Sequence, residues 1–507
     1  MSYYQFALVD YIVFHDRGML QAGDCGDTKD CFDYEILICV AKAMIILHRR
    51  EKTSFMEKKT QETELFDPAG RKKFAKYVSL NILAMLGSSC YIVADTFFVA
   101  MGVGADGLAA LNLAIVLFSF MQAMGLLIGI GSGTGYGVRK SRGDFKDGNR
   151  IFTIALMTGI AAGTVFLLAG NLFSSQLAHL MGADSRIMGL TALYIRVIFT
   201  CAPFFICNHI LVAFVRNDEN PRLAAIALLI SNGSNIILDY VFICLFNWSM
   251  FGAAAATGLS PVISICVLSR HFIGKKNRFR FIGRNTFCGV ADTASAVWEF
   301  CRLGVSSMVN ELSVGLVVMI FNFLFLGLGG NTAVAAYGVV TNVGLFAFAI
   351  FTGAAQGVQP LVSDYYGRGI TGQIRIIRRD TLMVTAALAL VLIAAVYGFT
   401  GEIAAAFNES GDPVMQKIAE EGLRIYFLCF LFGGANIAMT GYFSAMERAD
   451  LGFSISLLRG FLIIAPCAVI FSRLFGMTGI WISVPVTEAV TFVLMLLMMR
   501  KKLPQTF

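Results

Sequence analysis

Long runs of apolar side chains, separated by short polar loops, make up most of the chain after residue 76. Each run is about 20 residues or longer, the length that an α-helix needs to cross a hydrocarbon layer about 30 Å thick. Strands of a membrane barrel would instead alternate apolar and polar residues over about ten positions. The pattern therefore predicts twelve membrane-spanning helices, at 77–101, 107–131, 151–171, 188–214, 222–246, 252–273, 299–327, 333–361, 381–400, 422–444, 450–472 and 477–499.

The composition excludes a soluble enzyme and a disordered chain. Of the 507 residues, 57% are hydrophobic and 14% are charged, and the mean hydropathy is +0.71. Charged residues usually make up about a quarter of a soluble domain. The missing charge is replaced by apolar side chains that a surface in contact with water would not tolerate.

The positive charge is distributed by side of the membrane. Most of the 40 Lys and Arg residues fall before the first span, in every second loop and in the tail. The other six loops hold only Arg186, Lys417 and Arg473. By the positive-inside rule, both termini face the cytoplasm. The net charge of +7 is thus explained by topology, and we expect no nucleic-acid partner.

Residues 1–65 do not share the pattern, and we expect a disordered cytoplasmic leader. Their apolar stretch, 36–47, is interrupted by Lys42 and is too short to span a membrane. We further expect that Met56 is the natural start, so that residues 1–55 are absent from the native protein. The remaining boundaries are an N-lobe of helices 1–6, an interlobe loop, a C-lobe of helices 7–12 and a cytoplasmic tail, at 66–274, 275–298, 299–500 and 501–507.

The two lobes are predicted to be copies of one design. Five residues around the fourth helix recur 228 residues later around the tenth, and other pairs recur at an offset of 224. Since six is even, both copies start on the cytoplasmic side, and a pseudo-two-fold axis along the membrane normal relates them. The chain is thus an all-α membrane protein of two six-helix lobes, whose rocking would give alternating access. The recurring residues are Arg196, Phe199, Cys201, Phe204 and Asn208.

Several polar residues lie inside the predicted spans, where ionisable groups usually face a cavity. Asp95, Asp239 and Thr257 all lie roughly 7 to 11 Å below the outer surface, as estimated from their positions in the helices. Asn232 and Asn235 precede Asp239 with i, i+3, i+7 spacing, so the three share one helix face. Such a group binds a proton or holds Na⁺, and the alternative is that it only joins helices.

Two further acids, Glu311 and Glu488, lie near the midplane of the second half. Asn322 is eleven residues from Glu311 and hence on nearly the same face. Either acid would suit a cationic substrate, although a structural role is the alternative, more so for Glu488. A separate GxxxG series in the second helix, starting at Gly125, predicts close helix packing.

No Walker-type, zinc-type or HExxH motif is present. The chain instead resembles the multidrug and toxic compound extrusion (MATE) family, especially its bacterial DinF-like branch, over about residues 66–500. The segments that carry the resemblance are VADTFFVAMGVGADGLAALNLA, SNGSNIILDYVFI, FGAAAATGLSP, NELSVGL and GAAQGVQPLVSDYYGRG.

The resemblance implies export of lipophilic, often cationic compounds in exchange for H⁺ or Na⁺, without another cofactor. It places an ion-coupling site, with Na⁺ as one candidate ion, at Asp95, Asn235, Asp239 and Thr257. We expect substrate binding at Glu311, Asn322 and Gln356. Some relatives carry an acid on the tenth helix that this chain lacks, so a C-lobe Na⁺ site is not expected.

We therefore predict a multi-pass protein of the inner (plasma) membrane, a monomer that binds small amphipathic drugs or toxins and is not an enzyme. One alternative is a flippase for lipid-linked polysaccharide or cell-wall precursors, a class that often has fourteen crossings and a cationic cleft. A second alternative is an intramembrane transferase, which would want a clustered acid motif such as DDxxD that this sequence lacks.

Overall fold

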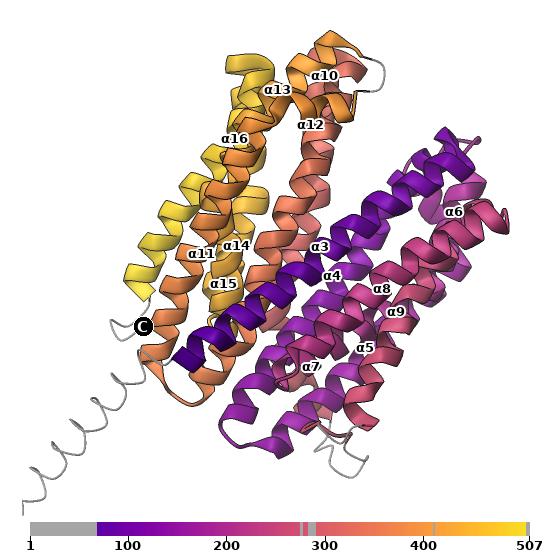
Figure 1. The fold of residues 1–507 in the computed structure, drawn as a ribbon. Coiled ribbons are helices and arrows are strands. Elements are labelled where there is room, and N and C mark those ends of the chain that lie inside the picture. Colours follow the sequence, from indigo (N-terminus) through magenta and orange to yellow (C-terminus); the bar gives the residue numbers. More distant parts are fainter. Residues whose placement is uncertain (1–67, 274–276, 282–289, 409–410, 503–507) are drawn as a thin grey trace, which may run out of the picture. The chain divides into compact units, whose positions relative to one another are not determined.

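The structure, a computed structural model, describes residues 68–273, 277–281, 290–408 and 411–502 (Figure 1). These residues are almost all helical, as the apolar runs predict. They belong to one compact unit that begins at Pro68. The predicted leader, 1–65, and the expected start at Met56 lie outside the described residues. Most of the predicted tail and part of the interlobe loop lie outside them too.

The N-lobe contains the helices of the first half. Its helices α6 and α7 meet at an angle of 48° and together form one bent crossing. The helices are α3 (Pro68–Val103), α4 (Ala105–Ser141), α5 (Phe145–Leu180), α6 (Met188–Thr200), α7 (Ala202–Asn217), α8 (Pro221–Asp239), the π-helix η1 (Tyr240–Leu245) and α9 (Ser249–Ile273).

The C-lobe contains the helices of the second half. Its helices α13 and α14 meet at an angle of 51° and again form one bent crossing. The helices are α10 (Val290–Gly367), α11 (Thr371–Gly398), α12 (Thr400–Ala406), α13 (Pro413–Phe427), α14 (Phe430–Ala445), α15 (Ala449–Leu457), the π-helix η3 (Leu458–Leu462) and α16 (Ile464–Lys502).

Two continuous helical stretches are far too long for one crossing, namely α10 and the 53-residue stretch Ala449–Lys501 that α15, η3 and α16 form together. A straight α10 of 78 residues would extend about 120 Å, several times the hydrocarbon thickness. The chain breaks the helix at Gly330 (φ 61°, ψ −155°), and again within α16 at Gly476 (φ 61°, ψ −137°). Only glycine adopts this backbone region readily. Each long segment thus supplies two crossings, and with the two bent pairs the described residues supply the predicted twelve.

The irregular joints recur in both lobes, as the internal repeat predicts. The bent crossings break at Cys201 and at Cys429, which are corresponding residues of the repeat. A π-helical segment lies in the fifth crossing of the N-lobe and in the fifth of the C-lobe. Pro261 and Pro485, also corresponding residues, lie inside the sixth crossing of each lobe. The lobes therefore share their helices and also their deviations from regular helix.

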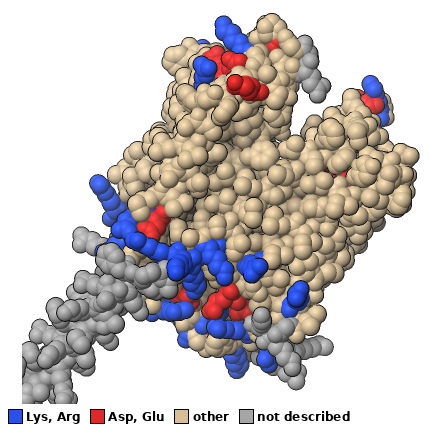
Figure 2. All heavy atoms as spheres, viewed as in Figure 1, with Lys and Arg blue, Asp and Glu red and all other residues tan. Residues whose placement is uncertain are grey.

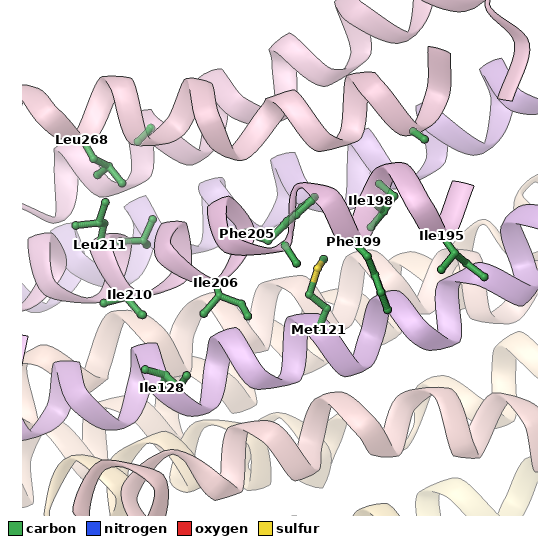
Figure 3. Close-up of a cluster of buried hydrophobic side chains, with 14 of the residues drawn as sticks. Met121, Ile128, Ile195, Ile198, Phe199, Phe205, Ile206, Ile210, Leu211 and Leu268 are labelled. Carbon is green, nitrogen blue, oxygen red and sulfur yellow. The ribbon is translucent and has the colours of Figure 1, made fainter. Parts of the chain in front are cut away.

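The core of the N-lobe forms where α4 packs against α6 and α7. Figure 3 shows the apolar side chains between these helices, with Met121 and Ile128 reaching from α4 toward Phe205 and Ile206 of α7. The glycines of α4 allow the backbones of α4 and α7 to approach closely. A Cβ atom at Gly129 would lie 2.8 Å from the backbone oxygen of His209. The predicted packing role of the GxxxG series is confirmed.

The two lobes contact each other at the end of the molecule where basic side chains gather, in the lower part of Figure 2. The Arg139 guanidinium of α4 donates two hydrogen bonds, of 2.9 and 2.8 Å, to the Glu299 carboxylate of α10. The Ser141 hydroxyl donates a 2.8 Å hydrogen bond to Asp364 of α10. The ribbons of the two lobes diverge toward the opposite end (Figure 1). The structure therefore shows the basic end closed.

Buried charges at this basic end are mostly paired. The Lys140 ammonium lies 3.1 Å from Glu219 and donates to the Asn217 backbone oxygen at 3.0 Å. Partial burial acts to raise the pKa of the Glu219 carboxyl, but Lys140 and other nearby cations outweigh burial and hold this pKa below its usual value. The turn between α7 and α8 is thereby attached to the end of α4.

Candidate functional site

Two aspartates from different helices meet inside the N-lobe. Asp95 of α3 is 8% exposed and Asp239, the last residue of α8, is fully buried. Their carboxyl groups lie close enough to interact with each other. Each also keeps a buried Oδ1 atom with no hydrogen-bond partner among the described residues.

Polar groups from α8 and α9 extend this acid pair. In the orientation that satisfies both neighbours, the Asn235 amide donates to Asp239 at 3.1 Å and accepts from the backbone N–H and hydroxyl of Thr257, each at 3.3 Å. Asn235 and Thr257 are buried. The four predicted ion-coupling residues thus form one cluster, and their carboxylate, amide and hydroxyl oxygens are ligands that suit a proton or a hard cation such as Na⁺.

The π-helical segment η1 begins at the residue directly after Asp239. In a π turn the hydrogen bonds run from i to i+5, so the backbone deviates from α geometry just where the acid sits. Such segments occur frequently at functional sites. The irregular backbone of the fifth crossing therefore begins directly after the acid.

A cavity of about 260 Å³, called here the N-lobe cavity, lies beside the cluster; most of its wall comes from the N-lobe, and Glu311, Thr352 and Gln356 of α10 complete it. Asn235 and Thr257 form part of its wall, and the Asp239 carboxyl accepts the hydrogen bond from Asn235 without lining the cavity itself. Tyr91, one turn before Asp95 on α3, also lines the cavity. The Asp239 carboxyl is thus connected to the cavity wall through the Asn235 amide.

A second cavity, of about 390 Å³, lies between the lobes and shares one wall with the first. Glu311 and Gln356, both of α10, line the two cavities, so the structure brings these predicted substrate residues together. Asn322 is half-buried and is absent from the walls of both cavities. Gln356 therefore shares a cavity wall with Glu311, and Asn322 does not.

Glu488, the fourth intramembrane acid, has a strong partner. The Arg459 guanidinium of η3 donates to its carboxylate at 2.6 Å, and Asn436 of α14 donates to it at 2.7 Å. Arg459 and Glu488 both line the larger cavity and are largely buried. A carboxylate held in this way has its charge compensated, so the structure favours the structural alternative for Glu488.

A known family model matches both lobes of the chain. The model of the MatE family matches residues 81–241 and 307–470, one match in each lobe. The chain belongs to the MATE family. The matches include Asp95, Asn235 and Asp239 of the acid cluster, and Glu311 of the cavity wall.

Relatives and solved structures of the MATE family cover most of the chain. The multidrug export protein MepA of Staphylococcus aureus (strain MRSA252) is 26% identical over 419 residues, 82% of this chain and 91% of that protein. A MATE protein crystallised with MaL6 aligns with a TM-score of 0.80 at 20% identity, over 85% and 96% of the two chains. An outward-facing MATE transporter of the MOP superfamily also reaches 0.80, at 19% identity and the same coverage. These proteins are transporters rather than enzymes, as the sequence predicts.

Three residues near the site of this MATE protein were not predicted from the sequence. Tyr91 lies one turn before Asp95 on the same face of α3, a spacing that would have indicated it. Tyr194 of α6 is buried close to Thr257, and no local pattern indicates that it lies there. Arg216 is assigned to a cytoplasmic loop by the charge distribution, but it is part of α7 and lines the N-lobe cavity.

Proposed function

We propose that this MATE transporter is a secondary active multidrug exporter. It moves lipophilic, often cationic compounds out of the cell in exchange for H⁺ or Na⁺, by alternating access. The observation that carries this proposal is the buried polar cluster of Asp239, Asn235 and Thr257, with Asp95 close to it, beside a cavity lined by Glu311. The similarity to a relative named a multidrug export protein supports the choice of substrates.

The cavities suit amphipathic cations. Glu311 supplies an acid in a wall that is otherwise rich in apolar and aromatic side chains, including Phe348 and Tyr426 of the C-lobe. Aromatic faces attract cations, and an acid in a low-dielectric setting attracts them more strongly than in water.

The acid pair couples export to an ion. In the conformation with the basic end closed, H⁺ or Na⁺ enters from outside and neutralises Asp95 and Asp239. The loss of negative charge weakens the hold of the cavity on a cationic substrate, which leaves before the lobes rock back. Only this difference in affinity between the two states shifts the equilibrium. One charge moved through 100 mV provides about 2.3 kcal/mol, enough for a gradient of roughly fortyfold.

The basic end lies in the cytoplasm in this proposal, because Lys and Arg are retained on that side of a membrane. It follows that the protein lies in the inner (plasma) membrane with its carboxyl terminus in the cytoplasm. Each chain carries both lobes and both cavities, so one copy is sufficient for transport. We therefore expect the monomer to be the active form.

The test compares Asp239→Asn with Asp106→Asn in everted membrane vesicles. Asp106 is a matched acid of the N-lobe, partly exposed and paired with Arg186 at 2.9 Å. We expect Asp239→Asn to abolish dye uptake into the vesicles and Asp106→Asn to retain it. A pH gradient and a Na⁺ gradient, imposed separately, identify the coupling ion. Unchanged transport by Asp239→Asn under both gradients would remove the acid pair from the coupling role.

A further inference from the structure

The N-lobe cavity contains a buried cation without a partner. Arg216 lies in the last turn of α7, is 4% exposed and lines the cavity of about 260 Å³. Its Nε atom is buried without a hydrogen bond, and no ion pair to its guanidinium occurs among the described residues. A buried charge is costly unless it is paired and hydrogen-bonded.

The neighbouring basic residue shows how unusual this is. Lys140 is about as deeply buried at the same end of the lobe, but it pairs with Glu219 and donates to a backbone oxygen. The closest acid in sequence, Asp218, already accepts hydrogen bonds from Tyr136 at 2.8 Å and lies 2.9 Å from the His271 ring. The carbonyl end of α7 adds partial negative charge near Arg216, which does not replace a hydrogen-bonded anion.

A second charge of opposite sign lines the same cavity. Glu311 of α10 has no ion pair among the residues that the structure describes, and it does not pair with Arg216. A ligand that carries both charges would satisfy both groups at once. Apolar side chains, among them Leu126, Ile130 and Val212, line the same cavity beside its polar groups.

We propose that the N-lobe cavity selects zwitterionic amphiphiles, compounds that carry a carboxylate as well as a cationic group. The carboxylate binds the Arg216 guanidinium, whose planar fork matches two carboxylate oxygens. The cationic group lies toward Glu311, and the apolar body of the ligand fills the space between. This inference rests on the proposed export function and specifies its substrate class.

The experiment uses two xanthene dyes that differ at one group. One carries a cationic ring system and a free carboxylate, and the other is its ethyl ester, which is only cationic. Binding to the full-length protein in lipid nanodiscs is measured by fluorescence anisotropy for the wild type, Arg216→Gln, Arg216→Lys and Arg222→Gln. Arg222 is the matched control, because it lies six residues later and its side chain is exposed.

We expect Arg216→Gln to weaken binding of the carboxylate dye by about tenfold or more, the loss that a charge-assisted hydrogen-bond pair gives. Binding of the ester should change less than twofold. Arg216→Lys should recover part of the affinity, because it keeps the charge and loses the fork. Arg222→Gln should leave both dyes unaffected. Binding of the ester also shows that each variant is folded.

Three results would overturn the inference. An equal loss for both dyes would give Arg216 a general role in transport, and no loss for either would remove it from ligand binding. An Arg222→Gln variant that loses carboxylate affinity as strongly as Arg216→Gln would point to surface charge. In each case export of the ester by the wild type leaves the proposed function standing. If wild-type vesicles export neither dye, the proposed function itself fails.

Discussion

Closing of the basic end depends on a contact between two glycines of facing helices, and a single methyl group should prevent it. A Cβ atom at Gly304 of α10 would lie 1.9 Å from the backbone oxygen of Leu127 in α4. The reciprocal atom at Gly131 would lie 1.8 Å from the backbone oxygen of Phe300. An ordinary contact is about 3.5 Å, so Gly304→Ala requires that the helices separate by about 1.5 Å.

The expected magnitude follows from packing energetics. Overpacking a close interface costs about 1–3 kcal/mol, and Gly304→Ala pays this cost only while the basic end is closed. Alanine also favours helix over glycine by about 1 kcal/mol, but that gain is equal in both conformations and cancels. The ratio of open to closed molecules should therefore rise by about fivefold to a hundredfold.

The matched control is Gly315→Ala, because no atom lies within 4 Å of a Cβ at that position of the same helix. Fluorophores attached through unnatural amino acids at positions 142 and 447 report the opening, since Arg142 and Glu447 lie 3.5 Å apart across the lobes. That exposed ion pair contributes little to stability. Single-molecule energy transfer should show a larger open population for Gly304→Ala. Equal populations in the two variants would refute the role of this contact in closing.

Two further variants test the buried and the exposed charges. Glu488→Gln should lower the thermal stability of the purified protein, because an uncompensated Arg459 costs about 3–5 kcal/mol. Adding Arg459→Gln should restore most of the lost stability. A double variant that is less stable than Glu488→Gln alone would contradict this explanation. Because the folded-state pKa of Glu219 is lowered, its pairing with Lys140 stabilises the protein above the usual carboxyl pKa and is lost as pH falls through the folded value. Melting curves from pH 7 to pH 3 should therefore show the wild type losing slightly more stability than Glu219→Gln, a small effect because Glu219 is 43% exposed.

The twelve crossings could be predicted because the length of an apolar run is set by the thickness of the bilayer. The breaks within the crossings could not. The bend before α7 has a local signal in Pro203 at the start of that helix. The equivalent bend at Cys429 has no nearby proline, and the π segments depend on a hydrogen-bond register that side-chain pattern does not determine.

The acid cluster could be predicted in part. The i, i+3, i+7 spacing of Asn232, Asn235 and Asp239 placed them on one face, and the estimated depths brought Asp95 and Thr257 to the same level. The structure confirms that these groups lie together, and their role in coupling stays a prediction.

The position of Arg216 could not be predicted from the sequence. Its burial depends on how α7 packs against the rest of the lobe, which the distribution of charge among loops does not reveal. Asn322 lies outside the walls of both cavities for the related reason that a shared helix face does not guarantee a shared cavity, and its role in substrate binding stays a prediction.

The joints that recur in both lobes carry information about ancestry. A bend in the fourth helix, a π turn in the fifth and a proline in the sixth occur in each copy, so a six-helix ancestor had them before its gene was duplicated. The charges at the fifth helix are different, with Asp239 just before one π turn and Arg459 inside the other. Both lobes thus retain the same bends and breaks in their helices, and the charged residues beside them diverged afterwards.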